Sequence, residues 1–386
     1  MYLARVLGAD GFGMYGFVGA VSAYFILFSN FGMEQFSTQR LSSRDVPSED
    51  TVIETVIVAR LFLSSIFAIV FLIFGILYSR NQLILFLFVF QSIFIVASAF
   101  NLQFYFVAAN RIKILSLLKG GTSLVILCCV LAFITGSSDL PKVTLIGGMT
   151  TLIFFLWGVY YVFSHASRRI VIPTYRDIVT LIKSAAPLGI SALMIQIYHS
   201  ADIIFLGFTN PGVQLGYYTG AYRIINVLSI APGLFYLTYL PELAKISSNH
   251  FSSKRTKEYI LILIGCGALI TVGCFIISGE LITTLLGNEY LPARSVFSIL
   301  LINAFLIFVN VSLAHLLIAW NHHKQYLVVV ASGAITNIIG NIVLIPSYGI
   351  IGAAIATVCA EAAVLIVTLY YHHRLHGLFS SKELAR

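Results

Sequence analysis

Long apolar stretches, each followed by a short polar break, fill almost all of the 386 residues. A helix needs about 20 predominantly apolar residues to cross the hydrocarbon layer of a membrane. Because that layer offers no water to backbone groups, each crossing must satisfy its own hydrogen bonds as a helix. The pattern therefore predicts an all-α integral membrane protein with eleven crossings, at about 12–32, 56–78, 83–107, 114–135, 142–163, 184–207, 217–240, 259–278, 293–319, 326–345 and 350–371.

Composition supports the same class. The chain is 59% hydrophobic and only 10% charged, with a mean hydropathy of +0.95, which lies outside the range of soluble domains. Its net charge of +8 does not indicate nucleic acid, because the basic residues are scattered through the breaks without interleaved aromatics. The five cysteines lie inside apolar runs without a CxxC motif. We expect no metal and no cofactor, and membrane lipids as general partners.

Lysine and arginine are distributed unevenly between the two sides. One set of alternate breaks holds seventeen of them, and the other holds only Arg5, Arg80, Lys142 and Arg294. The positive-inside rule makes the first set cytoplasmic, which places the C-terminus inside and residue 1 outside. An outside start with eleven crossings predicts that one helix is missing upstream.

An internal repeat relates the two halves of the chain. Ala109-Asn110-Arg111-Ile112-Lys113 recurs as Trp320-Asn321-His322-His323-Lys324, and Leu7-Gly8 recurs as Leu206-Gly207. Pro141, followed by Ile146-Gly147-Gly148, recurs as Pro346, followed by Ile351-Gly352-Ala353. Nearly constant offsets of this kind are typical of transporters built from repeated helical units.

The repeat predicts two parallel lobes of six helices. Five helices of the first lobe are visible and six of the second, so twelve are expected in a complete fold. The expected divisions are an N-terminal lobe at 1–163, a cytoplasmic linker at 164–183, a C-terminal lobe at 184–371 and a cytoplasmic tail at 372–386.

Several motifs resemble those of a known family. They are Leu3-Ala4-Arg5-Val6-Leu7-Gly8 to Gly11-Phe12-Gly13-Met14-Tyr15, the segment Asp202–Gly207, the segment Gly216–Arg223, and the segment Ile345–Thr357. Together they resemble polysaccharide biosynthesis proteins of the oligosaccharide flippase (Wzx) type. The resemblance implies the multidrug/oligosaccharidyl-lipid/polysaccharide exporter fold, lacking its first transmembrane helix.

The resemblance also implies a function. Members of this family are not enzymes. They flip undecaprenyl-diphosphate-linked oligosaccharide repeat units across the bacterial cytoplasmic (inner) membrane by alternating access between two lobes. The products are O-antigen, capsule or exopolysaccharide, so glycosyltransferases and a polysaccharide polymerase of the same pathway are expected partners.

Ionisable residues at membrane depth are the first site candidates, because they are costly there unless paired or facing water. Asp202 and Arg223 fall at similar depth on adjacent antiparallel helices, which predicts an ion pair. Arg223 would attract a diphosphate or acidic sugar, with Asp202 orienting it, or the pair would be a structural clamp. Arg60 and Lys119, near helix ends, are expected to reach out to lipid headgroups.

Other candidates surround that pair. His199 lies one turn from Asp202, where it is a proton-coupling group or a packing histidine. Glu361 has no basic residue at its depth, and we expect it to be protonated or bonded to Asn337 or Asn341, either as a structural group or as a proton-coupling group. The candidate substrate-binding residues beside Arg223 are Gln196, Asn226 and Tyr222, whose default roles are interhelical hydrogen bonds and interfacial anchoring.

Two other function classes fit less well. A cation-coupled multidrug antiporter of the same fold should carry a carboxylate cluster in the first lobe, and residues 56–163 hold no Asp or Glu at membrane depth. A polytopic lipid-linked-sugar polymerase needs a substantial extramembrane loop with acid and base groups, and the outer breaks are short.

Overall fold

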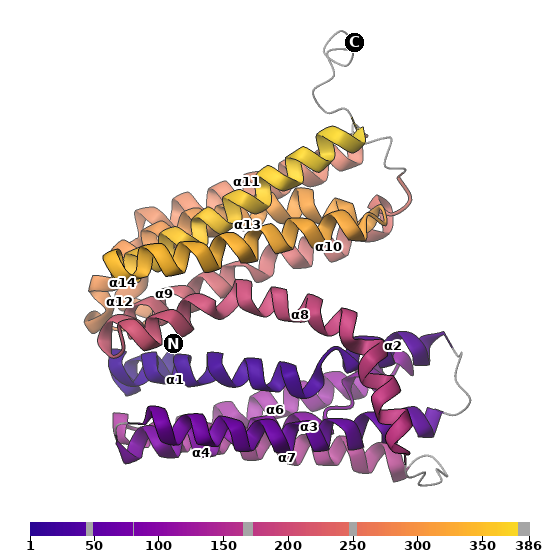
Figure 1. The fold of residues 1–386 in the computed structure, drawn as a ribbon. Helices are drawn as coiled ribbons and strands as arrows, with labels where there is room; N and C mark the ends of the chain where they lie inside the picture. Colours follow the sequence, from indigo (N-terminus) through magenta and orange to yellow (C-terminus); the bar gives the residue numbers. More distant parts are fainter. Residues whose placement is uncertain (44–48, 80, 165–172, 247–252, 377–386) are drawn as a thin grey trace. The chain divides into compact units, whose positions relative to one another are not determined.

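The computed structural model describes residues 1–43, 49–79, 81–164, 173–246 and 253–376, and in these ranges it is helical without a β-strand (Figure 1). The chain divides into two compact units. Residues 14–196 form one, here called the N-terminal unit. Residues 1–13 join 197–386 in the other, the C-terminal unit. The prediction of an all-α membrane protein is confirmed.

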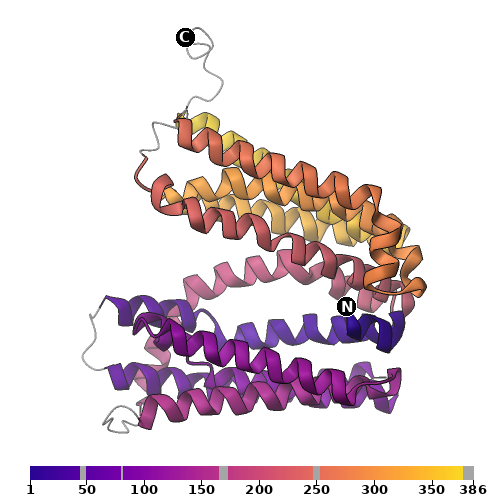
Figure 2. The ribbon, with the colours of Figure 1, turned by 180° about the vertical axis from the view of Figure 1, so that it is seen from behind.

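The N-terminal unit is a bundle in which α3, α4, α6 and α7 run side by side (Figures 1 and 2). Its elements are most of α1 (Tyr2–Asn30), α2 (Met33–Ser42), α3 (Glu49–Tyr78), α4 (Gln82–Ala97), the 3-10 turn η1 (Ser98–Phe100), α5 (Gln103–Ala108), α6 (Ile112–Phe133), η2 (Ser137–Asp139), α7 (Leu140–Ser164) and the first part of α8 (Tyr175–Thr209).

The C-terminal unit is organised around α13, which contacts α9, α10, α11 and α14 and is largely buried. Its elements are the end of α8, α9 (Val213–Leu228), α10 (Ile230–Leu243), α11 (Lys254–Ile276), α12 (Ser278–Leu285), η4 (Asn288–Ala293), α13 (Arg294–Ala319) and α14 (His323–His376). The α9–α10 break at Ser229 lies just before Pro232, whose missing amide donor favours a bend.

Among the described residues, ten helical segments are long and apolar enough to cross a membrane. The last, His323–Leu375, spans 53 residues, more than twice the length that one crossing needs. It is interrupted at Gly349, whose φ of 55° and ψ of −130° are not helical. This break separates the predicted crossings 326–345 and 350–371, so the ten segments accommodate the eleven predicted crossings.

The helix ends at Asn110 and Asn321 confirm the internal repeat. Both residues adopt a left-handed conformation, with φ of 55° and 61°. The next amide bonds back five residues in each case, from Arg111 to Phe106 at 2.8 Å and from His322 to Leu317 at 2.7 Å. Asparagine tolerates this conformation, which closes a helix by a Schellman-type cap. Asn110 and Asn321, which are 211 residues apart, therefore end their helices in the same way.

The two proline connections of the repeat differ in local geometry. Pro141 lies in the first turn of α7, after the connection through η2, whereas Pro346 lies three residues before the break at Gly349. The glycines that follow them also differ in environment. A Cβ on Gly147 would meet the Phe94 ring, and one on Gly352 would meet the Leu344 backbone. The two connections have different geometry, so equal sequence spacing does not give equal position.

The first thirteen residues pack tightly within the C-terminal unit. Gly8, with φ of 70°, interrupts α1, which agrees with the expected boundary between two helices at this point. The Tyr290 hydroxyl donates to the carbonyls of Ala4 and Gly8, each at 3.2 Å. A Cβ added to Gly216 would lie 1.8 Å from the Ala9 carbonyl oxygen. The backbones of α1 and α9 thus approach so closely that only glycine fits at this point.

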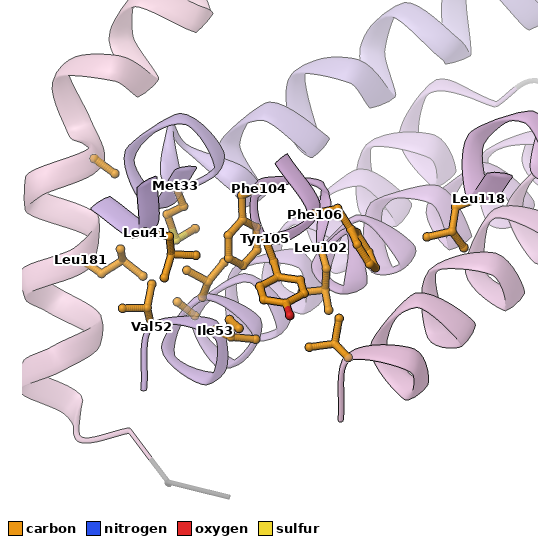
Figure 3. Close-up of a cluster of buried hydrophobic side chains, with 14 residues drawn as sticks. Met33, Leu41, Val52, Ile53, Leu102, Phe104, Tyr105, Phe106, Leu118 and Leu181 are labelled. Carbon is orange, nitrogen blue, oxygen red and sulfur yellow. The ribbon is translucent and has the colours of Figure 1, made fainter. Parts of the chain in front are cut away.

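Buried apolar residues of α2, α3, α5, α6 and α8 form a core at one end of the N-terminal unit, the ones labelled in Figure 3 being Met33, Leu41, Val52, Ile53, Leu102, Phe104, Tyr105, Phe106, Leu118 and Leu181. Arg60 lies beside it and is 1% exposed, so the expectation that it reaches lipid headgroups is wrong. Its guanidinium donates to Asn30 Oδ1 at 2.6 Å and to the Asn101 carbonyl at 2.8 Å. The helix ends near residues 30 and 101 supply these acceptors inside the protein.

Parts of the predicted linker and tail fall outside the described residues. Of the linker at 164–183, residues 165–172 are not described, and α8 begins at Tyr175. The tail at 372–386 is described as far as residue 376, where α14 ends. The lobe limits at 163 and 184 stay a prediction, and the two compact units divide within α1 and α8.

Candidate functional site

Two buried carboxylates of the C-terminal unit form the centre of the candidate site. Asp202 on α8 is 1% exposed and accepts a hydrogen bond from the Tyr218 hydroxyl. It also accepts from Thr357 Oγ1 at 3.4 Å and from the Ile203 amide at 2.9 Å. A carboxylate removed from water must find donors or cations of this kind, because burial without them is costly. Asp202 thus ties α8 to α9 and α14.

Glu361 on α14 is the second buried carboxylate, at 5% exposure. It accepts hydrogen bonds from the Tyr198 hydroxyl and from Asn310 Nδ2, and Asn310 also donates to the Glu361 carbonyl at 3.0 Å. The expectation of a bond to Asn337 or Asn341 is therefore wrong, because the amide that reaches Glu361 comes from α13. Asn341 donates instead to Asn337, at 2.9 Å, within α14.

A cavity of about 280 Å³ opens beside Glu361 within the C-terminal unit. Its wall combines apolar residues of α13 and α14 with polar groups, among them Tyr198, His199, Tyr222, Asn226, Asn310 and Glu361. Two further atoms on this wall, Asn303 Oδ1 and His315 Nδ1, are buried without a hydrogen-bond partner in the described part of the chain. Buried polar atoms in this state favour water or a polar ligand in the cavity.

The charge of this cavity limits what it can bind. Glu361 is its one acidic residue, and no lysine or arginine is among the described residues that line it. A carboxylate surrounded by amide and hydroxyl oxygens can hold a proton or a small cation, and it repels phosphate. The cavity is chemically suited to cation coupling and unsuited to anion binding.

The predicted ion pair between Asp202 and Arg223 is absent from the described structure. Arg223 is exposed on α9, whereas the hydroxyl that reaches Asp202 belongs to Tyr218. The turn between α8 and α9 covers only residues 210–212, so Arg223 lies about 15 Å from its end of the hairpin and Asp202 about 10 Å. Arg223 also points about 140° away from Tyr218 around the helix. Arg223 is therefore not a partner of Asp202.

The other predicted residues divide between the two units. His199, Tyr222, Asn226 and Glu361 all line the C-terminal cavity. The Tyr222 hydroxyl donates to the His199 carbonyl at 3.0 Å, and its ring stacks on that of Tyr218. Gln196 is the last residue of the N-terminal unit, where its carbonyl accepts from the Tyr24 hydroxyl at 3.3 Å.

Four residues of the site were missed as partners of the carboxylates, namely Tyr198, Tyr218, Asn310 and Thr357. A signal for Tyr218 existed, because it stands at nearly the depth of Asp202 once the turn is placed at 210–212. No comparable signal existed for Asn310, because spacing along the sequence does not show which residues of α13 and α14 lie side by side.

Comparison with known families decides the classification. Residues 1–247 match the family described as polysaccharide biosynthesis protein. The chain belongs to this family. The chain is also similar to the "Probable low-salt glycan biosynthesis flippase Agl15" of Haloferax volcanii, with 24% identity over 243 residues. The match covers 62% of this chain and 49% of that relative, so the chain spans about half the length of the relative.

Solved structures establish the fold. The chain is similar to a lipid II flippase, MurJ, in an inward closed conformation, with a TM-score of 0.71 and 15% identity. The match covers 96% of this chain and 83% of the MurJ chain. An inward-facing multidrug resistance MATE family transporter of the MOP superfamily gives a TM-score of 0.66 and 14% identity. That match covers 98% of this chain and 94% of the transporter. The fold is that of MOP superfamily transporters, shared by flippases and drug transporters.

Proposed function

We propose that this protein is a flippase that moves undecaprenyl-diphosphate-linked oligosaccharide repeat units across the bacterial cytoplasmic membrane, for assembly of O-antigen, capsule or exopolysaccharide. The observation that carries the proposal is the family match over residues 1–247. The similarity to a glycan biosynthesis flippase and to the fold of a lipid II flippase supports it. The chain works by alternating access and carries no catalytic role, with its C-terminus in the cytoplasm.

Arg223 is the proposed contact for the anionic part of the substrate. Its side chain is exposed and makes no ion pair with Asp202 in the described structure, which leaves the guanidinium available for a diphosphate. Tyr222 and Asn226 lie on the same helix, and Gln196 lies on α8. We assign these three to the sugar contacts of the proposed route.

Asp202, Glu361 and His199 are the proposed coupling groups. Both carboxylates are buried among hydroxyl and amide donors in the C-terminal unit, and no lysine or arginine lies against them in the described structure. A proton or small cation bound here would lower the cost of the buried charge and would be released when the helices move.

A deletion experiment tests the proposed function. In a strain lacking this gene, lipid-linked repeat units should accumulate on the cytoplasmic leaflet while surface glycan falls, and the intact gene should restore both. Separation of the leaflets by a membrane-impermeant glycosidase measures the distribution. Normal surface glycan without accumulation, in a strain shown to hold no second flippase gene, would contradict the proposal. Strains that lack a glycosyltransferase or the polymerase of the same pathway provide the phenotypes for comparison.

A multidrug antiporter is the second candidate, and the fold similarity to MATE transporters favours it. The feature expected of an antiporter is a carboxylate cluster in the first lobe. Such a cluster is missing from the helices that the structure describes at 56–163. Drug sensitivity of the deletion strain separates the two functions. Increased sensitivity to cationic drugs with unchanged surface glycan would favour the antiporter.

A further inference from the structure

A second cavity, in the N-terminal unit, is the repeat counterpart of the cavity beside Glu361. It has a volume of about 250 Å³ and lies among η1, α5, α6 and α7. Five of its lining positions, namely Phe100, Gln103, Leu115, Leu118 and Lys119, correspond at the offset of 211 residues to Val311, Ala314, Tyr326, Val329 and Val330. All five of these counterparts line the C-terminal cavity. The two cavities thus share these five repeat positions.

The charges of the two cavities are opposite. The C-terminal cavity holds Glu361 and no lysine or arginine among its described lining residues. The N-terminal cavity holds Lys119 and no Asp or Glu among its own, and the residue at the equivalent position in the second half is Val330. Lys119 makes no ion pair within the part of the chain that the structure describes. An unpaired ammonium in a partly apolar hollow attracts an anion.

The backbone differs between the repeats at the same place. In the second half, α13 continues unbroken through the counterpart residues up to Ala319. In the first half, the helix is interrupted at Asn101 and Leu102, between η1 and α5, where the backbone is no longer helical. Non-helical backbone at membrane depth is tolerated where it is buried in protein or lines a polar cavity. Both departures from the repeat, the break and the lysine, therefore make this hollow more polar.

Depth and lining further define the ligand. Asn101 lies seven residues before the end of α5 at Ala108, and Lys119 lies seven residues after the start of α6 at Ile112, so both are about 10 Å from the same end of the hairpin. Ser123 and Thr151 add hydroxyl groups beside the lysine, while most of the remaining wall is apolar. This lining suits an amphiphile with an anionic group.

We propose that this hollow, the Lys119 cavity, binds the diphosphate group of a polyprenyl diphosphate, with the first isoprene units against its apolar wall. Its assignment to the transported substrate rests on the proposed flippase function. It is a second anion contact, in a different unit from Arg223. Lys119 is exposed and lies about 10 Å along α6 from Ile112, and competition with phosphatidylglycerol separates a diphosphate from a phospholipid headgroup.

Binding of farnesyl diphosphate to the purified full chain in phosphatidylcholine nanodiscs tests this site. Replacing Lys119 by the residue of the other repeat, Lys119→Val, should weaken binding about tenfold or more, and Lys119→Arg should preserve it within about threefold. Lys113→Val is the matched control, because Lys113 is an exposed lysine of the same helix that does not line the cavity. The control should bind as the wild type does.

Three probes identify what is recognised. Farnesol, which lacks the phosphates, should bind weakly and equally to the wild type and Lys119→Val. Inorganic pyrophosphate should bind more weakly than farnesyl diphosphate, because it does not use the apolar wall. Wild-type affinity in Lys119→Val would overturn the site and leave Lys119 as a lysine that reaches the membrane surface. Equal competition by phosphatidylglycerol, or equal affinity for pyrophosphate, would also overturn it.

These outcomes are independent of the flippase test. Lys119-dependent binding of farnesyl diphosphate together with normal glycan export in the deletion strain would refute the proposed function and leave the diphosphate site standing. Lost export in the deletion strain together with Lys119-independent binding would refute the site alone. Melting temperatures of the variants show that each binding result comes from folded protein.

Discussion

At the residue scale, the buried carboxylates of the C-terminal unit depend on neutral donors. Asp202 is bonded to a tyrosine and a threonine, and Glu361 to a tyrosine and an asparagine. Such donors stabilise a buried carboxylate without neutralising it, so a proton or cation can still bind and leave. An arginine partner would have fixed the charge permanently.

Removing the Tyr218 hydroxyl tests the first of these contacts. Tyr218→Phe should lower the stability by about 1–2 kcal/mol, because the buried carboxylate of Asp202 loses a donor that the membrane cannot replace. Thermal melting in detergent measures the change. Tyr160→Phe, in which the altered ring is 68% exposed, should melt as the wild type does. Equal melting of the Tyr218 and Tyr160 variants would show that the contact contributes nothing.

Arg223 gives a transport prediction at the same scale. Arg223→Gln should reduce glycan export about tenfold or more, and Arg223→Lys should be intermediate, since lysine keeps the charge but not the two-pronged geometry that suits a diphosphate. Arg255→Gln is the control, because Arg255 pairs with Glu242 and Glu258 at an exposed surface. Full export by the Gln variant would refute the assignment of Arg223.

At the element scale, the crossings could be predicted from sequence because their length is set by the membrane and their apolar content by the lipid. Breaks inside a crossing could not, since the interruption at Asn101 and Leu102 changes neither length nor hydropathy. The same limit explains Arg60, whose acceptors arise at such helix ends. Asp202 was found from its depth, but its partner was missed because the turn at 210–212 is shorter than the sequence suggested.

The close approach of α1 and α9 gives a prediction for a whole element. Gly216→Ala would place a methyl group 1.8 Å from the Ala9 carbonyl oxygen, so the two backbones must separate. A loss of about 1–3 kcal/mol is expected, measured as a lower melting temperature. Gly265→Ala on α11 meets nothing within 4 Å and should melt at the same or a slightly higher temperature, because alanine favours a helix. Identical behaviour of the two variants would contradict the tight packing.

At the scale of the whole molecule, the two repeated units carry cavities of opposite charge. The repeat, anchored by Asn110 and Asn321, gives each unit a hollow at equivalent positions. The C-terminal hollow became acidic and the N-terminal hollow basic. In the proposed function, one would hold the coupling ion and the other the diphosphate, an arrangement that composition alone could not reveal because the chain contains few charges in total.

Transport by the purified protein is the most direct test of this account. The protein would be reconstituted into vesicles containing a polyprenyl-diphosphate-linked oligosaccharide, and a glycosidase added outside would report how much of the glycan reaches the outer leaflet. The account predicts that the protein makes the inner-leaflet glycan accessible, and that Arg223→Gln abolishes most of this gain. Accessibility no greater than in protein-free vesicles, with folded protein present, would contradict it.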